Sequence, residues 1–153
     1  MAVRAAIKDN GKAASTLGDQ SIIRVQWNGL LSTSTDTGQP IPFSEYCDAV
    51  VHLGVLNIQT GGGSTLGTSD SISMQGSNDY QPSATDDGNP ANAGTWIILK
   101  DIGNVVVTAT ALATAFNINE RPLWIRPALT AGTGGTWNVV LSAYRRQNML
   151  RGG

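Results

Sequence analysis

Charged side chains are scarce in this sequence of 153 residues. Lys, Arg, Asp and Glu make up 14% of the chain, against roughly 25% in an ordinary soluble domain. Glycine is frequent instead, with 18 residues, and Ser, Thr and Asn are common. This composition indicates short strands joined by polar turns. It also predicts a surface that neighbours in an assembly partly cover, because charge is depleted in the buried centre of protein interfaces.

Cysteine and histidine occur once each, as Cys47 and His52, so few side chains are available for catalysis or metal binding. A single cysteine excludes an intrachain disulfide. A zinc site needs about four ligands, more than this pair supplies without carboxylates or partner chains. The G-x-S-x-G elbow of hydrolases is absent, and nothing places the two glutamates, Glu45 and Glu120, together as an acid–base pair. We therefore expect no enzyme, no catalytic residue, no cofactor and no metal site.

Two chemical alternatives stay open. His52 is conceivable as the base of a small hydrolase, in a triad with a Ser or with Cys47, because the members of a catalytic triad need not be sequence neighbours. The loop 78–89, "NDYQPSATDDGN", holds several Asp and Asn residues that could wrap an ion, although their spacing is not that of an EF-hand. The favoured interpretation is structural in each case: a packed or rim histidine, a buried inert thiol at Cys47, and turn-forming Asp and Asn.

Long apolar runs are also missing. No stretch approaches the roughly 20 apolar residues of a membrane helix, and the N-terminus shows no apolar signal-peptide core. Nucleic-acid binding usually needs a basic face with aromatic platforms, whereas the net charge here is −1 and the four Trp residues stand among apolar neighbours. We expect the Trp residues in the core or in an interface, and we expect neither a membrane nor a nucleic-acid partner.

The small net charge conceals a strong pattern along the chain. Residues 25–99 contain seven acidic residues and no Lys or Arg, whereas residues 1–24 carry a net charge of +2 and residues 100–153 a net charge of +4. Two basic ends and an acidic middle are able to orient the protein on a charged partner.

Strand patterns dominate what is present. Apolar residues alternate in 21–28, where Ile23, Val25 and Trp27 share one face, and in 71–77, where Ile72 and Met74 do. The longer run 48–59 predicts a central strand buried on both faces, with a bulge at Gly54. Further strands are expected at 95–101 and at the start of 105–113.

The last third of the chain predicts an antiparallel hairpin. The runs 121–130 and 135–147 flank "AGTGG", and each has apolar residues of one parity. Pro127 cannot donate a hydrogen bond to a ladder, so it predicts an edge strand or a bulge.

Six or seven strands without a long helical period predict an all-β fold, an antiparallel β-sandwich that is jelly-roll-like with an extended N-terminal arm. The expected organisation is an arm at 1–20, the sandwich domain at 21–147 and a C-terminal tail at 148–153.

Two stretches within residues 70–146 are distinctive: "SISMQGSNDYQPSATDDGNPANAGTWIILKDIGN" and "RPLWIRPALTAGTGGTWNVVLSAYRR". They resemble small virion proteins of tailed bacteriophages. In that group a strand ends in a Q-x-S-x-D turn, here Gln75, Ser77 and Asp79, and an aromatic residue, here Trp96, opens the next strand. A late "WIRP" strand (124–127), a Gly-Thr hairpin and a Val-rich strand follow.

The resemblance implies a capsid decoration, or cement, protein. Such a protein binds the major capsid protein on the outer surface of the head as a homo-oligomer, with a trimer favoured, after synthesis in the host cytoplasm. The basic ends are the candidates for contact with the shell: Arg4, Lys8, Lys12, Arg145, Arg146 and Arg151. The acidic loop 76–94 would face solvent or a neighbouring copy, and its oligomer or surface candidates are Asp79, Tyr80, Asp86, Asp87 and Trp96. The alternative is a carbohydrate- or receptor-binding β-sandwich module of a phage tail or fibre.

Overall fold

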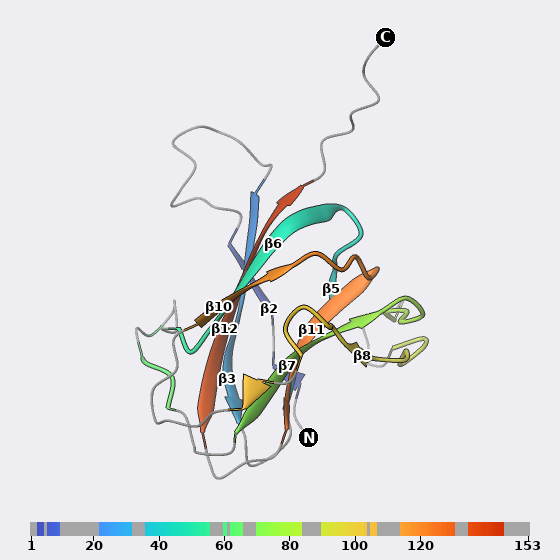
Figure 1. Cartoon of the computed structure of the whole chain (residues 1–153). Coiled ribbons are helices and arrows are strands. Elements are labelled where there is room, and N and C mark those ends of the chain that lie inside the picture. The colour runs from blue at the N-terminus through green and yellow to red at the C-terminus, as the bar shows by residue number, and fades with distance from the viewer. Residues whose placement is uncertain are drawn as a thin grey trace.

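The computed structural model describes residues 3–4, 6–9, 22–31, 36–55, 60, 62–65, 70–83, 90–103, 105–106, 114–130 and 135–145. Over these residues the chain forms strands and turns, and no helix long and apolar enough to span a membrane occurs among them. The strands make two sheets that pack against each other (Figure 1), so the expected all-β sandwich is confirmed.

The first sheet, called sheet A, has the order β1-β4-β11-β7-β8, with β5 also paired to β11 and β9 to β7. Its strands are β1 (Val3–Arg4), β4 (Thr37–Gly38), β5 (Ile41–Pro42), β7 (Ser71–Ser77), β8 (Ile97–Ile98), β9 (Val105–Val106) and β11 (Trp124–Thr130). Its pairs are antiparallel except β1 with β4, which is parallel.

The second sheet, called sheet B, is antiparallel throughout and has the order β10-β6-β12-β3-β2. Its strands are β2 (Ala6–Asp9), β3 (Ile22–Leu31), β6 (Tyr46–Leu53), β10 (Thr114–Ile118) and β12 (Thr136–Arg145). The sequence pattern gave no indication of β10.

Period-two alternation builds the core between the sheets, because successive side chains of a strand point to opposite faces. The core-facing side chains of sheet B include those of Ile23, Val25, Trp27, Val51, Trp137, Val139 and Leu141. Those of sheet A include Ile72, Met74, Ile125 and Leu129. Each large side chain buried here contributes about 1.5–3 kcal/mol through removal of apolar surface from water. The parities predicted for 21–28, 71–77 and 135–147 are confirmed.

The prediction for residues 48–59 is wrong in two respects. β6 ends at Leu53, and its burial alternates, with Val51 buried but Asp48 and His52 exposed. One face of β6 packs on the core and the other meets solvent, as is usual in antiparallel sheets. Gly54 does not form a bulge inside the strand. It follows the strand in a bend with a φ of 72°, a conformation that glycine adopts without strain.

The predicted hairpin between 121–130 and 135–147 is also wrong. β11 lies in sheet A, paired with β7, β4 and β5, whereas β12 lies in sheet B, paired with β3 and β6. The chain therefore crosses from one sheet to the other between them. Alternation alone cannot distinguish the two arrangements, because both place one face of each strand on the core.

Pro127 lies in an interior strand of sheet A and not in an edge strand, at a bulge-like irregularity where the chain from β4 to β5 has one residue more than β11. Ile125 pairs with Ile41 of β5, and Ala128 pairs with Thr37 of β4. Pro127 lies between these two contacts, where the neighbouring chain passes from β4 to β5 and the ladder is interrupted. The missing amide hydrogen of the proline therefore leaves no ladder partner unsatisfied.

Several expected boundaries differ from the observed ones. The strand expected at 95–101 is reduced to the two residues of β8, and the one expected at 105–113 begins with the two residues of β9. In the segment expected as an arm, β1 joins sheet A and β2 joins sheet B. Residues 10–20, 107–113 and 148–153 lie outside the described residues, so the arm and tail boundaries stay predictions.

Candidate binding surface

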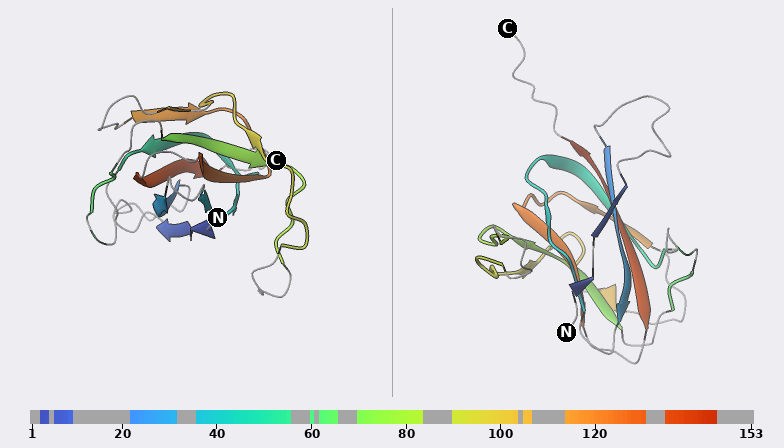
Figure 2. Two further views of the ribbon diagram at one scale, coloured as in Figure 1. Left: turned by 90° about the horizontal axis from the view of Figure 1, so that it is seen from below. Right: turned by 180° about the vertical axis from the view of Figure 1, so that it is seen from behind.

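Two stretches, residues 78–83 and 90–96, leave sheet A between β7 and β8 and form what we call the projection. They run side by side, because the amides and carbonyls of Gln81 and Asn92 exchange two hydrogen bonds of 3.0 and 3.2 Å. Figure 2 shows the projection extending beyond the two sheets. The acidic residues Asp86 and Asp87, expected at this surface, lie outside the described residues.

Asp79 closes the base of the projection. Its Oδ1 accepts hydrogen bonds from the Thr95 amide at 2.6 Å and the Ser77 hydroxyl at 2.8 Å, and its Oδ2 accepts one from the Thr95 hydroxyl at 2.9 Å. The hydrogen bond from the Thr95 amide, followed by those from the two hydroxyls, lowers the pKa of Asp79 below its usual value. Asp79, expected as a contact residue, therefore joins the two ends of the projection.

Gly94 allows the two stretches of the projection to approach closely. Its φ is 74°, and a Cβ at this position would lie 2.8 Å from the Cα of Tyr80. Any other residue would be strained by the backbone conformation and by the contact.

Three aromatic rings link the projection to sheet A. The ring centroid of Tyr80 lies 5.4 Å from that of Trp96 and 5.1 Å from that of Trp124, the latter in an edge-on arrangement. Trp96 also donates a hydrogen bond of 2.8 Å from Nε1 to the carbonyl of Ala93. Trp124 belongs to β11, and all three side chains are partly exposed. We call Tyr80, Trp96 and Trp124 the aromatic cluster.

Arg126 borders this cluster. Its Cζ lies 4.0 Å from the centroid of the Trp96 ring, and its Nε donates a hydrogen bond of 3.0 Å to Oε1 of Gln75, the residue opposite it in the β11–β7 ladder. Partial burial lowers the pKa of Arg126, and Tyr80 raises it by a smaller amount. No carboxylate in the described part of the chain pairs with this guanidinium.

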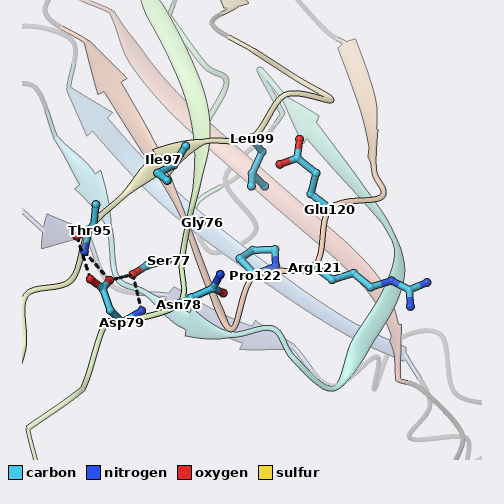
Figure 3. A pocket seen from close by; sticks show the side chains of 10 residues that line it. All are labelled: Gly76, Ser77, Asn78, Asp79, Thr95, Ile97, Leu99, Glu120, Arg121 and Pro122. Atoms are coloured by element: carbon cyan, nitrogen blue, oxygen red, sulfur yellow. Dashed lines mark hydrogen bonds between the residues drawn. The ribbon is translucent and has the colours of Figure 1, made fainter.

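A cleft of about 510 Å³ lies at the base of the projection (Figure 3). Ile97, Leu99 and Pro122 supply its apolar lining. Gly76 forms part of the wall, and a Cβ on it would come within 2.7 Å of Pro122 and 2.9 Å of Leu99. Glu120 also lines the cleft, as Figure 3 shows.

The carboxylates of Glu120 and Asp101 hold two loops together. Glu120 Oε1 accepts hydrogen bonds from the amides of Lys100 and Asp101, and Asp101 Oδ2 accepts them from the amides of Asn119 and Glu120. Each carboxylate thus stabilises the loop that carries the other.

Large apolar side chains are exposed around the same region. The exposed fraction is 68% for Ile97, 41% for Ile98 and 47% for Leu123. Ile97 and Ile98 form β8, the last strand in the order of sheet A. A short, apolar strand at this position is suited to contact with another molecule.

The remaining predicted residues fall into two groups. Arg4, Lys8 and Arg145 belong to β1, β2 and β12, and Lys12, Arg146 and Arg151 lie outside the described residues. Their role in contact with a shell stays a prediction.

His52 is an exposed residue of β6, while Cys47 is partly exposed and not buried as expected. No group of His, Cys, Asp and Glu that could hold a metal ion is found among the described residues.

The sequence analysis names Tyr80 and Trp96 as surface candidates, but not Trp124 and Arg126 of β11 or Gln75 of β7. Trp124 and Arg126 alternate with the buried Ile125, so their shared outward face is readable from the pattern. Their proximity to Tyr80 and Gln75 depends on the β11–β7 pairing, which joins residues about fifty positions apart.

No family model and no curated protein matches the chain. Among solved structures, the SPBc2 prophage-derived protein YomS aligns with a TM-score of 0.44 and 11% identity, covering 80% of this chain and 94% of its own. The K1 cleaved adhesin domain of Lys-gingipain from Porphyromonas gingivalis W83 aligns with a TM-score of 0.36 and 9% identity, covering 94% and 85%. The K3 cleaved adhesin domain of the same protein gives 0.33 and 7%, covering 91% of each chain. Likenesses this weak assign neither a family nor a function.

Proposed function

We propose that the chain is a structural protein of a tailed-phage virion, a decoration protein that binds the outer surface of the head and stabilises its lattice. One observation carries the proposal. The base of the projection presents partly exposed Tyr, Trp and Arg side chains next to exposed Ile97 and Ile98. Tyr, Trp and Arg are the residue types that contribute most to binding at protein interfaces. The resemblance of residues 70–146 to decoration proteins supports the same role.

The mechanism requires binding and no reaction. A protein that binds the assembled lattice but not its separated subunits stabilises the assembly by mass action. A symmetric homo-oligomer, for which we favour a trimer, presents the same surface several times, and the contacts reinforce one another through effective concentration. In this proposal the partner is the major capsid protein, and the chain takes no cofactor and is not an enzyme.

A carbohydrate- or receptor-binding module of a tail or fibre is the second candidate. The partial exposure of Trp96 and Trp124 favours it, because sugars stack on exposed aromatic rings. The guanidinium of Arg126, however, lies 4.0 Å from the centre of the Trp96 ring and occupies one of its faces. Stacking on Trp96 is therefore limited to its other face, and the exposed Ile97 and Ile98 nearby favour contact with a protein.

The decisive experiment locates the chain on particles of the virus that encodes it. Electron microscopy of intact virions, with mass spectrometry of separated heads and tails, should find stoichiometric copies on the outside of the head. Purified chain added to heads that lack it should bind to saturation and raise the temperature at which they release DNA. Presence in tails alone, or failure to bind heads, would contradict the proposal, and a saturable response on a glycan array would support the second candidate.

A further inference from the structure

Arg126 is a partly buried cation that has no carboxylate partner among the described residues. Its Nε is engaged by Gln75 and one face of its guanidinium lies against Trp96. No acidic side chain pairs with it among the described residues, and partial burial lowers its pKa. A charge removed from water without a counter-ion is unfavourable, and a carboxylate from outside would offset that cost.

The remaining donors of Arg126 are free to receive such a group. Nη1 and Nη2 make no hydrogen bond to a described residue, and neither is among the buried atoms without a partner, so both reach solvent. A guanidinium donates two parallel hydrogen bonds to a carboxylate. Because Trp96 and Gln75 already fix the plane of the group, little conformational entropy would be lost on binding.

The neighbours of Arg126 indicate what would surround the carboxylate. Ile98 and Gln75 are cross-strand partners, as are Gln75 and Arg126, so the three residues form one row across β8, β7 and β11. Trp96 and Trp124 border the same area, and 41% of the Ile98 side chain is exposed. A charged centre with an apolar and aromatic border matches an acidic side chain that has apolar neighbours.

We propose that Arg126, Trp96, Trp124 and Ile98 form the docking surface of this chain, and that its occupant is a Glu or Asp side chain of the partner protein, held bidentately by Arg126. The inference rests on the proposed function and specifies the surface that carries it. The partner chemistry follows from a cation that no carboxylate of the described residues pairs with, since a neutral or basic group would not supply the missing negative charge.

An acidic sugar offers the same carboxylate and is the competing source. Its ring would need an aromatic face to stack on, and Arg126 already covers one face of Trp96. The exposed Ile98 also favours an aliphatic side chain over a hydroxylated ring. The test therefore includes a sugar acid beside the peptides.

The first test uses the ¹⁵N-labelled full chain and two blocked peptides, acetyl-Leu-Glu-Leu-amide and acetyl-Leu-Gln-Leu-amide. The Glu peptide should shift the Arg126 Nε–H and Trp96 Nε1–H signals saturably, and the Gln peptide should bind at least about tenfold more weakly. R126Q should abolish the difference and R126K should reduce it, because lysine keeps the charge without the planar fork. K100Q removes an exposed charge outside the surface and should leave the difference unchanged.

Equal responses to the two peptides, or an unchanged preference for Glu in R126Q, would overturn the inference. Sodium glucuronate binding at least as well as the Glu peptide would overturn the assignment to a protein partner. Thermal unfolding of R126Q and R126K checks that both fold, and the comparison of the two peptides on the native chain does not depend on any variant.

The second test uses heads that lack the chain, and it separates the two proposals. R126Q should bind them at least about tenfold more weakly than the native chain, whereas K100Q should bind normally. If the native chain and R126Q bind heads equally, the decoration role stands and the docking surface is wrong. If the native chain prefers the Glu peptide yet does not bind heads, the surface stands and the decoration role is wrong.

Discussion

At the scale of single residues, Asp79 is the acidic side chain that joins the two stretches of the projection. It was expected at a contact surface because it lies in an acidic loop, yet its oxygens accept hydrogen bonds from Ser77 and Thr95. The sequence shows that Asp79 follows Ser77 by two positions in the Q-x-S-x-D motif, and the structure adds the hydrogen bond between their side chains. Its link to Thr95, sixteen positions later, depends on the return path of the chain and is not readable from the pattern.

The lowered pKa of Asp79 predicts a pH dependence. Because the folded pKa lies below the unfolded value, the stabilisation is fully present above about pH 4 and is lost as the pH falls through the folded pKa. We expect the Trp96 Nε1–H signal to change in this acidic window, because protonation removes acceptors from Thr95. NMR spectra between pH 7 and pH 2 measure it.

Asp79→Asn should remove this acid transition, since an amide does not titrate. Asp101→Asn is the matched control. It alters another exposed carboxylate that accepts backbone hydrogen bonds, away from the projection, and should keep the transition. An identical transition in the Asp79→Asn protein would show that another group causes it.

Gly76 illustrates packing at the same scale. Its missing side chain leaves room for Pro122 and Leu99, since a Cβ would lie 2.7 and 2.9 Å from them. We expect Gly76→Ala to lower the free energy of unfolding by about 1–3 kcal/mol through overpacking. Gly62→Ala is the control, because its nearest contact is the Thr60 hydroxyl at 3.3 Å, and its effect should stay within about 0.5 kcal/mol. Urea unfolding measures both, and equal effects would contradict the packing argument.

At the scale of elements, strand parity was predictable and strand partnership was not. The alternation in β7 and β12 identified which residues face the core, because burial imposes a local period of two. The partners of β11 depend on contacts distant in sequence, and the same alternation fits a hairpin or a crossover. The edge strand predicted from Pro127 is wrong for a related reason. A proline fits this interior strand because β4 and β5 leave a gap opposite it.

The projection is an element whose order depends on a strand outside it. Trp124 of β11 contacts Tyr80, and Tyr80 contacts Trp96. We expect Trp124→Ala to speed amide exchange at Gln81 and Asn92 at least about tenfold through local unfolding, while the amides of β3 and β12 stay protected. Hydrogen–deuterium exchange measured by NMR tests this.

Leu123→Ala is the matched control for that substitution. Leu123 is adjacent in sequence and 47% exposed, and its aliphatic side chain supplies no aromatic ring to pack against Tyr80. The substitution also keeps the Leu123 amide that donates to Asn78 Oδ1. Its substitution should leave exchange in the projection unchanged. If the two variants behaved alike, the projection would owe its order to Asp79 and Gly94 and not to the aromatic cluster.

At the scale of the whole molecule, two different kinds of positive charge are available to a partner. Arg126 is partly buried beside Trp96, whereas the candidates at the chain ends follow from the +2 and +4 charges of residues 1–24 and 100–153. Exposed charges accelerate encounter and are screened by salt, and partly buried pairs mainly slow dissociation. The two groups of residues should therefore act on different rate constants.

Binding kinetics on immobilised heads separate these contributions. Arg146→Gln combined with Arg151→Gln should lower the association rate constant and change the dissociation rate constant little. It should also weaken the dependence of association on salt between 0.05 and 0.5 M NaCl, a range over which the screening length falls from roughly 14 to 4 Å. R126Q should raise the dissociation rate at least about tenfold and leave the salt dependence of association in place. If the double variant instead controlled dissociation, the basic end would be the anchor itself. The docking surface at Arg126 would then not hold the capsid partner, and its assignment would be wrong.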